Sequence, residues 1–323
     1  MSNANQTIKA SLEYLNKLII GQSKLVKRLY TALLADGHLL VEGAPGLAKT
    51  TAIKALAGNL EGDFHRVQFT PDLLPADLTG TEIYRPQDST FHFQQGPLFH
   101  NFVLADEINR APAKVQSALL EAMGERQITV GRTTYQLPNM FLVMATQNPI
   151  EQEGTYPLPE AQLDRFLMHV NIDYPDVSAE REILQLVRNQ SKNIKGYDHE
   201  KPNDVSQEMV FTARNEILEI HMADSIEEYI VQLIAATRTP TDYGDDLAQW
   251  IMFGASPRGT IALDKCARAN AWLEGRDYVA PEDIHEVAID VLKHRILLSF
   301  EAEAEGVTSQ KIVQELLDRV PVS

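Results

Sequence analysis

Two stretches of this sequence carry residues of the types and spacing that handle a phosphate group. In the first, residues 41–50 (VEGAPGLAKT), an apolar run leads into a glycine-containing turn that ends in Lys49 and Thr50. Backbone amides at a strand-to-helix turn converge on an anion, and the helix dipole and a lysine charge assist them. Gly43 and Gly46 supply the conformational freedom of such a turn. The stretch therefore predicts a phosphate-binding loop.

One residue departs from the strict form of this loop, because Ala48 stands where glycine normally precedes the lysine. Ala48 lies where the loop enters the following helix, so we expect a small residue with good helix propensity to be tolerated there. Thr50 keeps the hydroxyl that a magnesium ion needs. A tight turn without a ligand is the alternative for this stretch alone, and the rest of the chain decides between the two.

The second stretch places two adjacent carboxylates after an apolar run, in NFVLADE at residues 101–107. Asp106 is predicted to support a magnesium ion, and Glu107 to polarise a water for in-line attack on the γ-phosphate of ATP. A further apolar run ends with Gln147 and Asn148, and a neutral amide there suits the positioning of that water. Two solvated acids at the start of a loop are the ordinary alternative, which the lysine loop makes improbable.

Short apolar runs alternate with helical patterns up to about residue 175, which predicts a mostly parallel sheet wrapped by helices. The runs are nearly all apolar, as in strands covered on both faces. Beyond this point only helical periodicity continues, so we expect an α/β domain at residues 1–175 and a small all-helical domain at residues 176–323. The predicted strands are residues 38–43, 101–107, 140–147 and 165–172.

Local signals in the second half predict helix starts and core positions. Ser225 with Glu228 has the pattern of a capping box, and Pro281 suits the first turn of a helix. Cys266, the single cysteine, lies at helical spacing among apolar residues, which predicts core packing and excludes an intrachain disulfide. The nine histidines form no pair with the spacing of a zinc site.

The charge balance limits the partners. The chain has 45 acidic and 29 basic residues, and its formal net charge of −16 would repel a nucleic acid backbone. Residues 1–22 lack the basic start and apolar stretch of a signal peptide, and no apolar run approaches the length of a membrane span. We therefore expect a cytoplasmic protein with no nucleic acid partner and no membrane span.

The combined motifs resemble those of AAA+ ATPases, and specifically those of the MoxR family, over about residues 15–310. GAPGLAKT resembles the Walker A motif of that family, including the alanine before the lysine, and FVLADEINRA resembles its Walker B motif. MATQNP resembles its sensor 1, LPEAQLDRFLM its arginine-finger region and GASPRG its sensor 2. The resemblance implies a P-loop parallel-sheet domain followed by a helical lid, with ATP and Mg²⁺ as ligands.

The resemblance also implies roles for individual residues. Lys49 and Thr50 would contact the phosphates and Mg²⁺, and Asp106 would support the metal. Glu107 would be the catalytic base and Asn148 sensor 1. The turn just before the first helix would form the adenine pocket. The residues expected to bind the nucleotide are Ile20, Gly21, Gly43, Ala44, Pro45, Gly46, Leu47, Ala48, Lys49, Thr50 and Thr51, and those for the metal are Thr50 and Asp106.

Three arginines are candidates for completing the site. Arg165 occupies the place from which related ATPases reach into the neighbouring subunit's site, and Arg258 occupies that of sensor 2. Arg110 is a second candidate for the contact in trans, and a surface ion pair with Asp164 is the alternative role of Arg165. Whether Arg258 acts within its own subunit or across the interface stays open, because the magnesium-chelatase branch places its lid differently.

Two insertions, residues 78–99 and 124–139, combine β-type residues with turn signals at Pro86 to Asp88 and at Gly131, which predicts two hairpins. Similar hairpins in the superfamily point toward the central pore of a ring, and surface decoration is the alternative. Exposed aromatic side chains with few cations suit the gripping of a polypeptide. The aromatic residues expected to be exposed are Tyr84, Phe91, Phe93 and Tyr135.

The function that the resemblance implies is an ATP-driven machine that remodels, matures or activates protein complexes. Such machines assemble as homo-oligomeric rings, with six subunits as the expected number. In the family they often work with proteins that carry a von Willebrand factor A domain. Two other classes stay open. One is a nucleic-acid or chelatase-type motor, of which the nucleic-acid motor would need basic hairpins. The other is a nucleotide-gated scaffold, which would need a damaged catalytic set.

Overall fold

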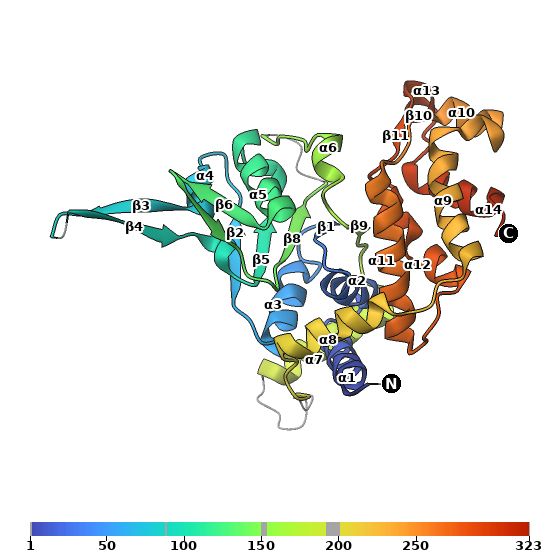
Figure 1. Cartoon of the computed structure of the whole chain (residues 1–323). Coiled ribbons are helices and arrows are strands. Elements are labelled where there is room, and N and C mark those ends of the chain that lie inside the picture. Colours follow the sequence, from blue (N-terminus) through green and yellow to red (C-terminus); the bar gives the residue numbers. More distant parts are fainter. Residues whose placement is uncertain (1, 88, 150–153, 192–200, 323) are drawn as a thin grey trace. The chain divides into compact units, whose positions relative to one another are not determined.

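The structure is a computed structural model, and it contains two compact units that are described in turn. Residues 2–158 and 170–210 form the α/β unit, and residues 159–169 and 211–322 form the helical unit. The residues that the structure describes are 2–87, 89–149, 154–191 and 201–322 (Figure 1).

The domain boundary expected at residue 175 stays a prediction. The compact units divide the chain at other places, because α7 (Val177–Ser191) groups with the α/β unit although it follows that boundary. The segment 159–169, which contains Arg165, groups instead with the helical unit. Met1 and Ser323, the ends of the two expected domains, lie outside the described residues.

A five-stranded sheet forms the centre of the α/β unit, in the order β2-β5-β8-β1-β9. The pairs β2–β5, β5–β8 and β8–β1 are all parallel, which confirms the predicted α/β class. Every residue of β5 is buried, as expected for a strand covered on both faces. The strands are β1 (Leu39–Glu42), β2 (Phe64–Gln68), β5 (Phe102–Asp106), β8 (Leu142–Gln147) and β9 (Met168–Asn171).

The edge strand β2 is absent from the strands predicted from the sequence. Its sequence FHRVQ mixes polar and apolar residues, and Val67 is its one buried residue. An edge strand has only one neighbour in the sheet, so it needs no continuous apolar run. Its register places Gln68 opposite Asp106 of β5. This pairing brings the polar side chains of β2 to the edge of the sheet where the predicted catalytic carboxylates lie.

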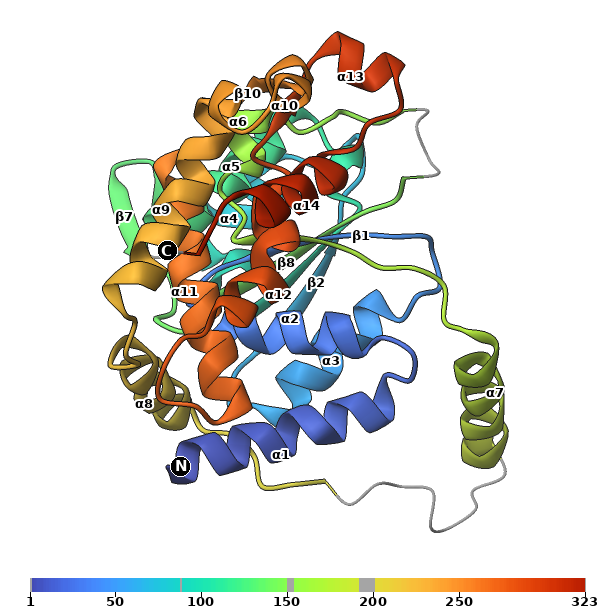
Figure 2. The same ribbon diagram turned by 90° about the vertical axis from the view of Figure 1, so that its right-hand side faces the viewer.

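The helices α1, α2 and α3 pack on one another in the α/β unit, as Figure 2 shows. A buried polar cluster joins one residue of each, because the Ser11 hydroxyl lies 2.5 Å from the Tyr30 hydroxyl and accepts a bond of 2.5 Å from Asn59 Nδ2. Such satisfied polar contacts specify one packing arrangement. The helices of this unit are α1 (Asn3–Leu18), α2 (Ser23–Leu34), α3 (Lys49–Asn59), α4 (Pro75–Thr79), α5 (Ala113–Glu125) and α7 (Val177–Ser191).

Both predicted hairpins are confirmed, and the first projects from the rest of its unit (Figure 1). Asp88, in its predicted turn, lies outside the described residues. Tyr84 and Phe91 are exposed at 50% and 66%. Phe93 and Tyr135 were expected to be exposed, but they stack on each other with ring centroids 4.0 Å apart and are half-buried. The hairpin strands are β3 (Gly80–Arg85), β4 (Thr90–Gln95), β6 (Gln127–Val130) and β7 (Thr133–Gln136).

The helical unit packs α9, α11, α12 and α14 on one another (Figure 2) and also holds a small antiparallel sheet that the sequence did not predict. Cys266 is buried on α11, which confirms its predicted core position. The elements of this unit are α6 (Glu160–Leu163), α9 (Asp224–Arg238), α10 (Asp245–Trp250), β10 (Ile251–Phe253), α11 (Pro257–Glu274), α12 (Pro281–Leu292), β11 (Leu297–Leu298), α13 (Phe300–Ala304) and α14 (Ser309–Arg319), and α8 (Gln207–Leu218) spans the division.

One predicted helix start is confirmed and one is wrong. Pro281 is the first residue of α12, as expected for a residue that lacks an N–H. The capping box of Ser225 with Glu228 is wrong, because α9 already begins at Asp224 and no side chain caps it. Among the described residues, no helix is both long and apolar enough to span a membrane.

Candidate active site

The phosphate-loop candidate connects the end of β1 to the start of α3, as predicted. Gly46 has a φ of 85°, a left-handed conformation that glycine adopts without strain. Gly43 is needed for space instead, because a Cβ there would lie 2.4 Å from Ile172 Cγ1 and 2.8 Å from the Ile172 carbonyl oxygen. The conformational freedom expected of both glycines therefore applies to Gly46, whereas Gly43 allows a close approach of two backbone segments.

Ala48 precedes the first residue of α3 in a left-handed conformation, with φ 57° and ψ 17°.

 The expectation that helix propensity makes Ala48 acceptable is therefore wrong, because Ala48 is not in a helical conformation. A non-glycine residue in this region costs roughly 1–2 kcal/mol relative to the right-handed conformation. The small alanine side chain is tolerated here at a cost that glycine would not incur.

The Lys49 ammonium group is held by backbone oxygens at the mouth of the loop. Its Nζ donates to the Gly43 carbonyl at 2.5 Å and to the Gln147 carbonyl at 3.5 Å. Partial burial lowers the pKa of Lys49, and the nearby carboxylates of Asp106 and Glu107 oppose that shift. Carbonyl groups are weak partners for a full charge, so an anionic phosphate would compete well for this lysine.

The Asp106 carboxylate, at the end of β5, is 9% exposed and has partners on both oxygens. Arg66 of β2 binds Oδ2 with Nε at 3.1 Å and with Nη2 at 2.7 Å. The Thr146 hydroxyl of β8 donates to Oδ1 at 2.6 Å. These contacts compensate the cost of a nearly buried carboxylate and fix its orientation.

Glu107 follows in a left-handed conformation, with φ 57° and ψ 51°. Its backbone N–H donates to the Thr146 hydroxyl at 2.9 Å, so one threonine connects the two acidic residues. Its Oε2 accepts from Gln68 Nε2 at 2.7 Å and from Arg110 Nη1 at 3.0 Å. A strained backbone conformation that the surrounding contacts hold in place is typical of a functional site.

Arg110 therefore has a partner within its own chain. Its guanidinium forms an ion pair with Glu107 at 3.0 Å, three residues earlier in the sequence. This contact gives Arg110 a local role beside the proposed base, which differs from the contact in trans for which it was the second candidate.

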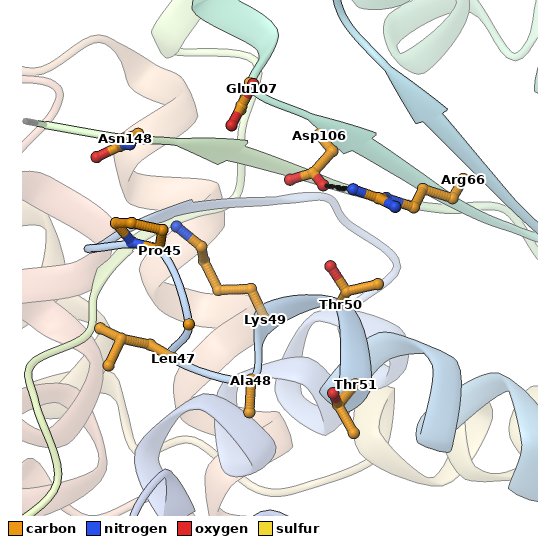
Figure 3. Close-up of a pocket in the computed structure, with 11 residues that line it drawn as sticks. Pro45, Leu47, Ala48, Lys49, Thr50, Thr51, Arg66, Asp106, Glu107 and Asn148 are labelled. Atoms are coloured by element: carbon orange, nitrogen blue, oxygen red, sulfur yellow. Dashed lines mark hydrogen bonds and ion pairs between the residues drawn. The ribbon is translucent and has the colours of Figure 1, made fainter. Parts of the chain in front are cut away.

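The side chains predicted for catalysis and phosphate binding largely converge on one cavity of about 360 Å³ (Figure 3). Three strand ends and the loop contribute to it, because the parallel strands β1, β5 and β8 end at the same edge of the sheet. Gly43 and Ala44, also predicted to bind the nucleotide, lie just before the lining residues. The lining consists of Pro45, Gly46, Leu47, Ala48, Lys49, Thr50, Thr51, Arg66, Asp106, Glu107 and Asn148.

The donor set fits Mg²⁺ bound together with a phosphate chain. Among the described residues, no group of three or more His, Cys, Asp or Glu side chains could hold a metal by itself. The cavity instead offers the Thr50 hydroxyl and the Asp106 carboxylate beside Lys49. Mg²⁺ usually takes one or two protein ligands and completes its shell with phosphate oxygens and water. These residues therefore suit a magnesium–nucleotide complex.

The predicted adenine pocket lies between two helices and not before the first one. Ile20 and Gly21 follow α1 and precede α2, and they are not among the residues that line the cavity. Gln22 Nε2 donates to the Asp173 carbonyl at 2.9 Å. A Cβ at Gly21 would lie 2.8 Å from Pro175 Cβ, so this turn packs tightly against the segment that leads into α7.

Arg165 and Arg258 both belong to the helical unit. Arg258 is 58% exposed, and its Nη1 lies 3.5 Å from Asp164 Oδ2, a weak surface contact. Asp164 is bound more closely by the Ser256 hydroxyl and by Arg295 Nε, each at 2.9 Å. The Asp164 carboxylate, which was considered as the ion-pair partner of Arg165, thus accepts hydrogen bonds from Ser256 and Arg295.

Sequence reasoning missed Arg66, Gln68 and Thr146, which hold the two carboxylates in place. The alternation of polar and apolar residues in FHRVQ was the available signal for β2. Thr146 is a single polar residue within an otherwise apolar run, and its position directly before Gln147 places it at the strand end. Only the parallel register of β2, β5 and β8 shows that these residues meet.

Comparison with known proteins agrees with this fold. The model of the ATPase family associated with various cellular activities (AAA) matches residues 38–168, and that of the AAA lid domain matches residues 248–316. The fold and the site thus define an AAA+ ATPase.

Relatives that match over most of their own length identify the family within the AAA+ ATPases. Chaperone MoxR1 of Mycobacterium tuberculosis is 45% identical over 97% of this chain and 82% of its own length. Protein MoxR of Methylorubrum extorquens is 34% identical over 87% of this chain and 85% of its own. A crystal structure of a protein from Cytophaga hutchinsonii that is assigned as an ATPase has a TM-score of 0.90 and 48% identity, and covers 99% of this chain and 96% of that one. The chain belongs to the MoxR family of AAA+ ATPases.

The loop geometry makes a prediction for Ala48 and Lys49. We expect Ala48→Gly to raise the free energy of unfolding by about 1 kcal/mol and to retain nucleotide binding, because glycine adopts the left-handed conformation freely. Ala48→Val should lower the free energy of unfolding, since a β-branched residue is an outlier there. Lys49→Ala should lose nucleotide binding. Urea unfolding and titration with a fluorescent ATP analogue measure these effects, and unchanged binding by Lys49→Ala would contradict the phosphate-loop assignment.

Proposed function

We propose that this chain hydrolyses ATP to ADP and phosphate and uses the energy to remodel, mature or activate protein complexes. The observation that carries the proposal is the convergence of Lys49, Thr50, Asp106 and Glu107 on one cavity, from the loop after β1 and the end of β5. The similarity to a protein named Chaperone MoxR1 supports a role on protein clients.

Each group in the cavity has a role that its position supports. Lys49 would exchange its backbone carbonyl partners for a phosphate oxygen, and Thr50 and Asp106 would hold Mg²⁺. The magnesium ion supplies neutralisation of charge on the phosphate oxygens. Glu107, oriented by Gln68 and Arg110, accepts a proton from the attacking water. Asn148 of the sensor 1 segment orients that water.

The proposal includes a homo-oligomeric ring, with six subunits expected, whose active sites are completed between neighbours. Arg165 is the first candidate for the arginine that acts in trans, and Arg258 is the candidate for sensor 2. The division into domains 1–175 and 176–323, a partner with a von Willebrand factor A domain and a cytoplasmic location belong to the same proposal. All of them follow from the resemblance and the sequence.

The hairpins favour a protein client over a nucleic acid. Tyr84 and Phe91 present exposed aromatic rings on the first hairpin. Of the few cations on the hairpins, Arg126 forms an ion pair with Asp36 at 2.6 Å, which reduces the positive charge offered to phosphates. A nucleotide-gated scaffold is disfavoured, because Glu107 and Asn148 are both present at the cavity.

The assignment of Glu107 as the base predicts the behaviour of Glu107→Gln. This variant should keep ATP binding and lose about a hundredfold or more of its turnover, because the amide preserves the shape of the side chain but accepts no proton. Phosphate release and binding of a fluorescent ATP analogue should be measured on the same preparation. An ATPase rate equal to that of the parent would assign the base to another residue.

A site between subunits predicts complementation. Arg165→Ala and Lys49→Ala subunits should each be inactive, and co-assembled mixtures should recover partial ATPase activity. Some interfaces would then pair an intact phosphate loop with an intact arginine, which stabilises the transferred phosphoryl group by roughly 10³-fold or more in rate. Mixtures that co-assemble but stay as inactive as either variant would exclude Arg165 as the residue that acts in trans.

The protein-client proposal predicts a response that depends on the first hairpin. ATPase activity should respond to a protein partner and should not respond to DNA or RNA at physiological salt. Phe91→Ala should keep basal hydrolysis and lose that response, since Phe91 is 66% exposed and is not among the residues that line the cavity. Phe253→Ala, which removes a ring of 65% exposure from the helical unit, is the matched control. Strong stimulation by nucleic acid that depends on Arg132 would favour the motor instead.

A further inference from the structure

The side chain of Arg295, just after α12, is 2% exposed and has no role in the site described above. Its Nε donates to Asp164 Oδ1 at 2.9 Å. Its two terminal nitrogens donate to the carbonyl oxygens of Phe166 at 2.7 Å and of Leu167 at 3.2 Å, and more weakly to that of Asp164 at 3.4 Å. A further bond reaches the Val291 carbonyl of α12. One guanidinium thus ties the segment 164–167 to the end of α12.

The chemistry of this contact requires an arginine. A guanidinium presents five N–H donors in a rigid planar fork, whereas an ammonium group offers three donors on a single nitrogen. Burial lowers the pKa of Arg295, and the charge of Asp164 opposes that shift. Burial also lowers the pKa of His294 well below its usual value, and its Nε2 lies 2.8 Å from Arg295 Nη1 and 3.2 Å from the Phe166 carbonyl oxygen. A buried cation is stable only with such a complete set of acceptors.

The segment that Arg295 holds is the one that contains Arg165. The carbonyl groups of Asp164 and Phe166, directly before and after Arg165 in the chain, are both among its acceptors. The Asp164 carboxylate also accepts from the Ser256 hydroxyl, which caps the start of α11 beside Arg258. Arg165, through the carbonyl groups beside it, and Arg258, through Ser256, are therefore both attached to the ion pair of Arg295 with Asp164.

We propose that Arg295 is a positioning residue for Arg165. It fixes the backbone on either side of Arg165, and through Asp164 it fixes the start of α11, so that Arg165 and Arg258 keep a constant relation to each other. The inference rests on the proposed function, in which Arg165 completes the site of a neighbouring subunit. Loss of Arg295 should then impair the arginine that a subunit donates and leave its own phosphate loop intact.

Complementation separates this role from a general effect on stability. Arg295→Gln should lose about a hundredfold of its ATPase rate, since misplacing a catalytic group by about 1 Å has an effect of that size. Its binding of a fluorescent ATP analogue should be unchanged. Mixed with Lys49→Ala subunits it should recover activity, because Lys49→Ala donates a correctly placed arginine to an intact loop. Mixed with Arg165→Ala subunits it should stay inactive, because neither subunit donates one.

A matched control lies in the same unit. Arg276 binds the buried carboxylate of Asp283 with bonds of 2.6 and 2.5 Å. Arg276→Gln therefore breaks a comparable ion pair away from the segment 164–167, and it should lower the melting temperature while keeping the ATPase rate near that of the parent. Should Arg295→Gln fail to fold, Arg295→Lys provides the same comparison, because it keeps the charge and loses the fork.

The outcomes are distinguishable. Recovery with Lys49→Ala and not with Arg165→Ala supports the positioning role. Suppose that co-assembled Arg165→Ala and Lys49→Ala subunits recover ATPase activity, whereas co-assembled Arg295→Gln and Lys49→Ala subunits do not. This result would overturn the positioning role of Arg295 and leave the proposed function unaffected. Equal loss of activity in Arg276→Gln and Arg295→Gln would also overturn it. If co-assembled Arg165→Ala and Lys49→Ala subunits did not recover ATPase activity, this result would contradict the proposed site between subunits and also the positioning role of Arg295.

Discussion

Parallel pairing of β1, β5 and β8 is the constraint on which the site depends. Parallel strands end at the same edge of a sheet, so the phosphate loop after β1, the carboxylates after β5 and the amide after β8 meet there. The helix that follows the loop adds its positive end at the same place. The groups of the site are far apart in the sequence, and this pairing alone brings them to one cavity.

Largely buried carboxylates organise both compact units in the same physical way. In the α/β unit, Arg66 and Thr146 satisfy Asp106, and in the helical unit Arg295 and Ser256 satisfy Asp164. A carboxylate that is mostly removed from water needs charged or hydroxyl partners on its oxygens, and those partners then fix its direction. Each ion pair therefore orients the segment that follows its acidic residue, which carries Glu107 in one case and Arg165 in the other.

Two non-glycine residues of the site adopt left-handed backbone conformations, Ala48 before α3 and Glu107 after β5. Each begins a turn into a helical segment, and each places an adjacent side chain in the cavity. The cost of such conformations is accepted where the surrounding structure holds them. The bond from the Glu107 backbone to Thr146 is one such contact.

The sequence by itself determined the fold class and the residues of local motifs. The phosphate loop, the strand that ends in Asp106 and Glu107, and the two hairpins could all be predicted, because each is a continuous stretch whose pattern reflects its own conformation. Some predictions made from local patterns failed. Helix propensity did not explain Ala48, since its conformation is imposed by the loop, and α9 began one residue before its predicted cap.

The tertiary structure alone decided which distant residues share the site. Arg66 and Gln68 lie on an edge strand with a weak apolar pattern, and only its register against β5 brings them to the two carboxylates. In the sequence, nothing distinguishes Arg295 from other cations near helix ends. In the structure, packing encloses it with Asp164, which lies 131 residues away along the chain. The physical reason is the same in both cases: a buried charge is assigned its partner by packing across the chain, and single-sequence spacing does not record that packing.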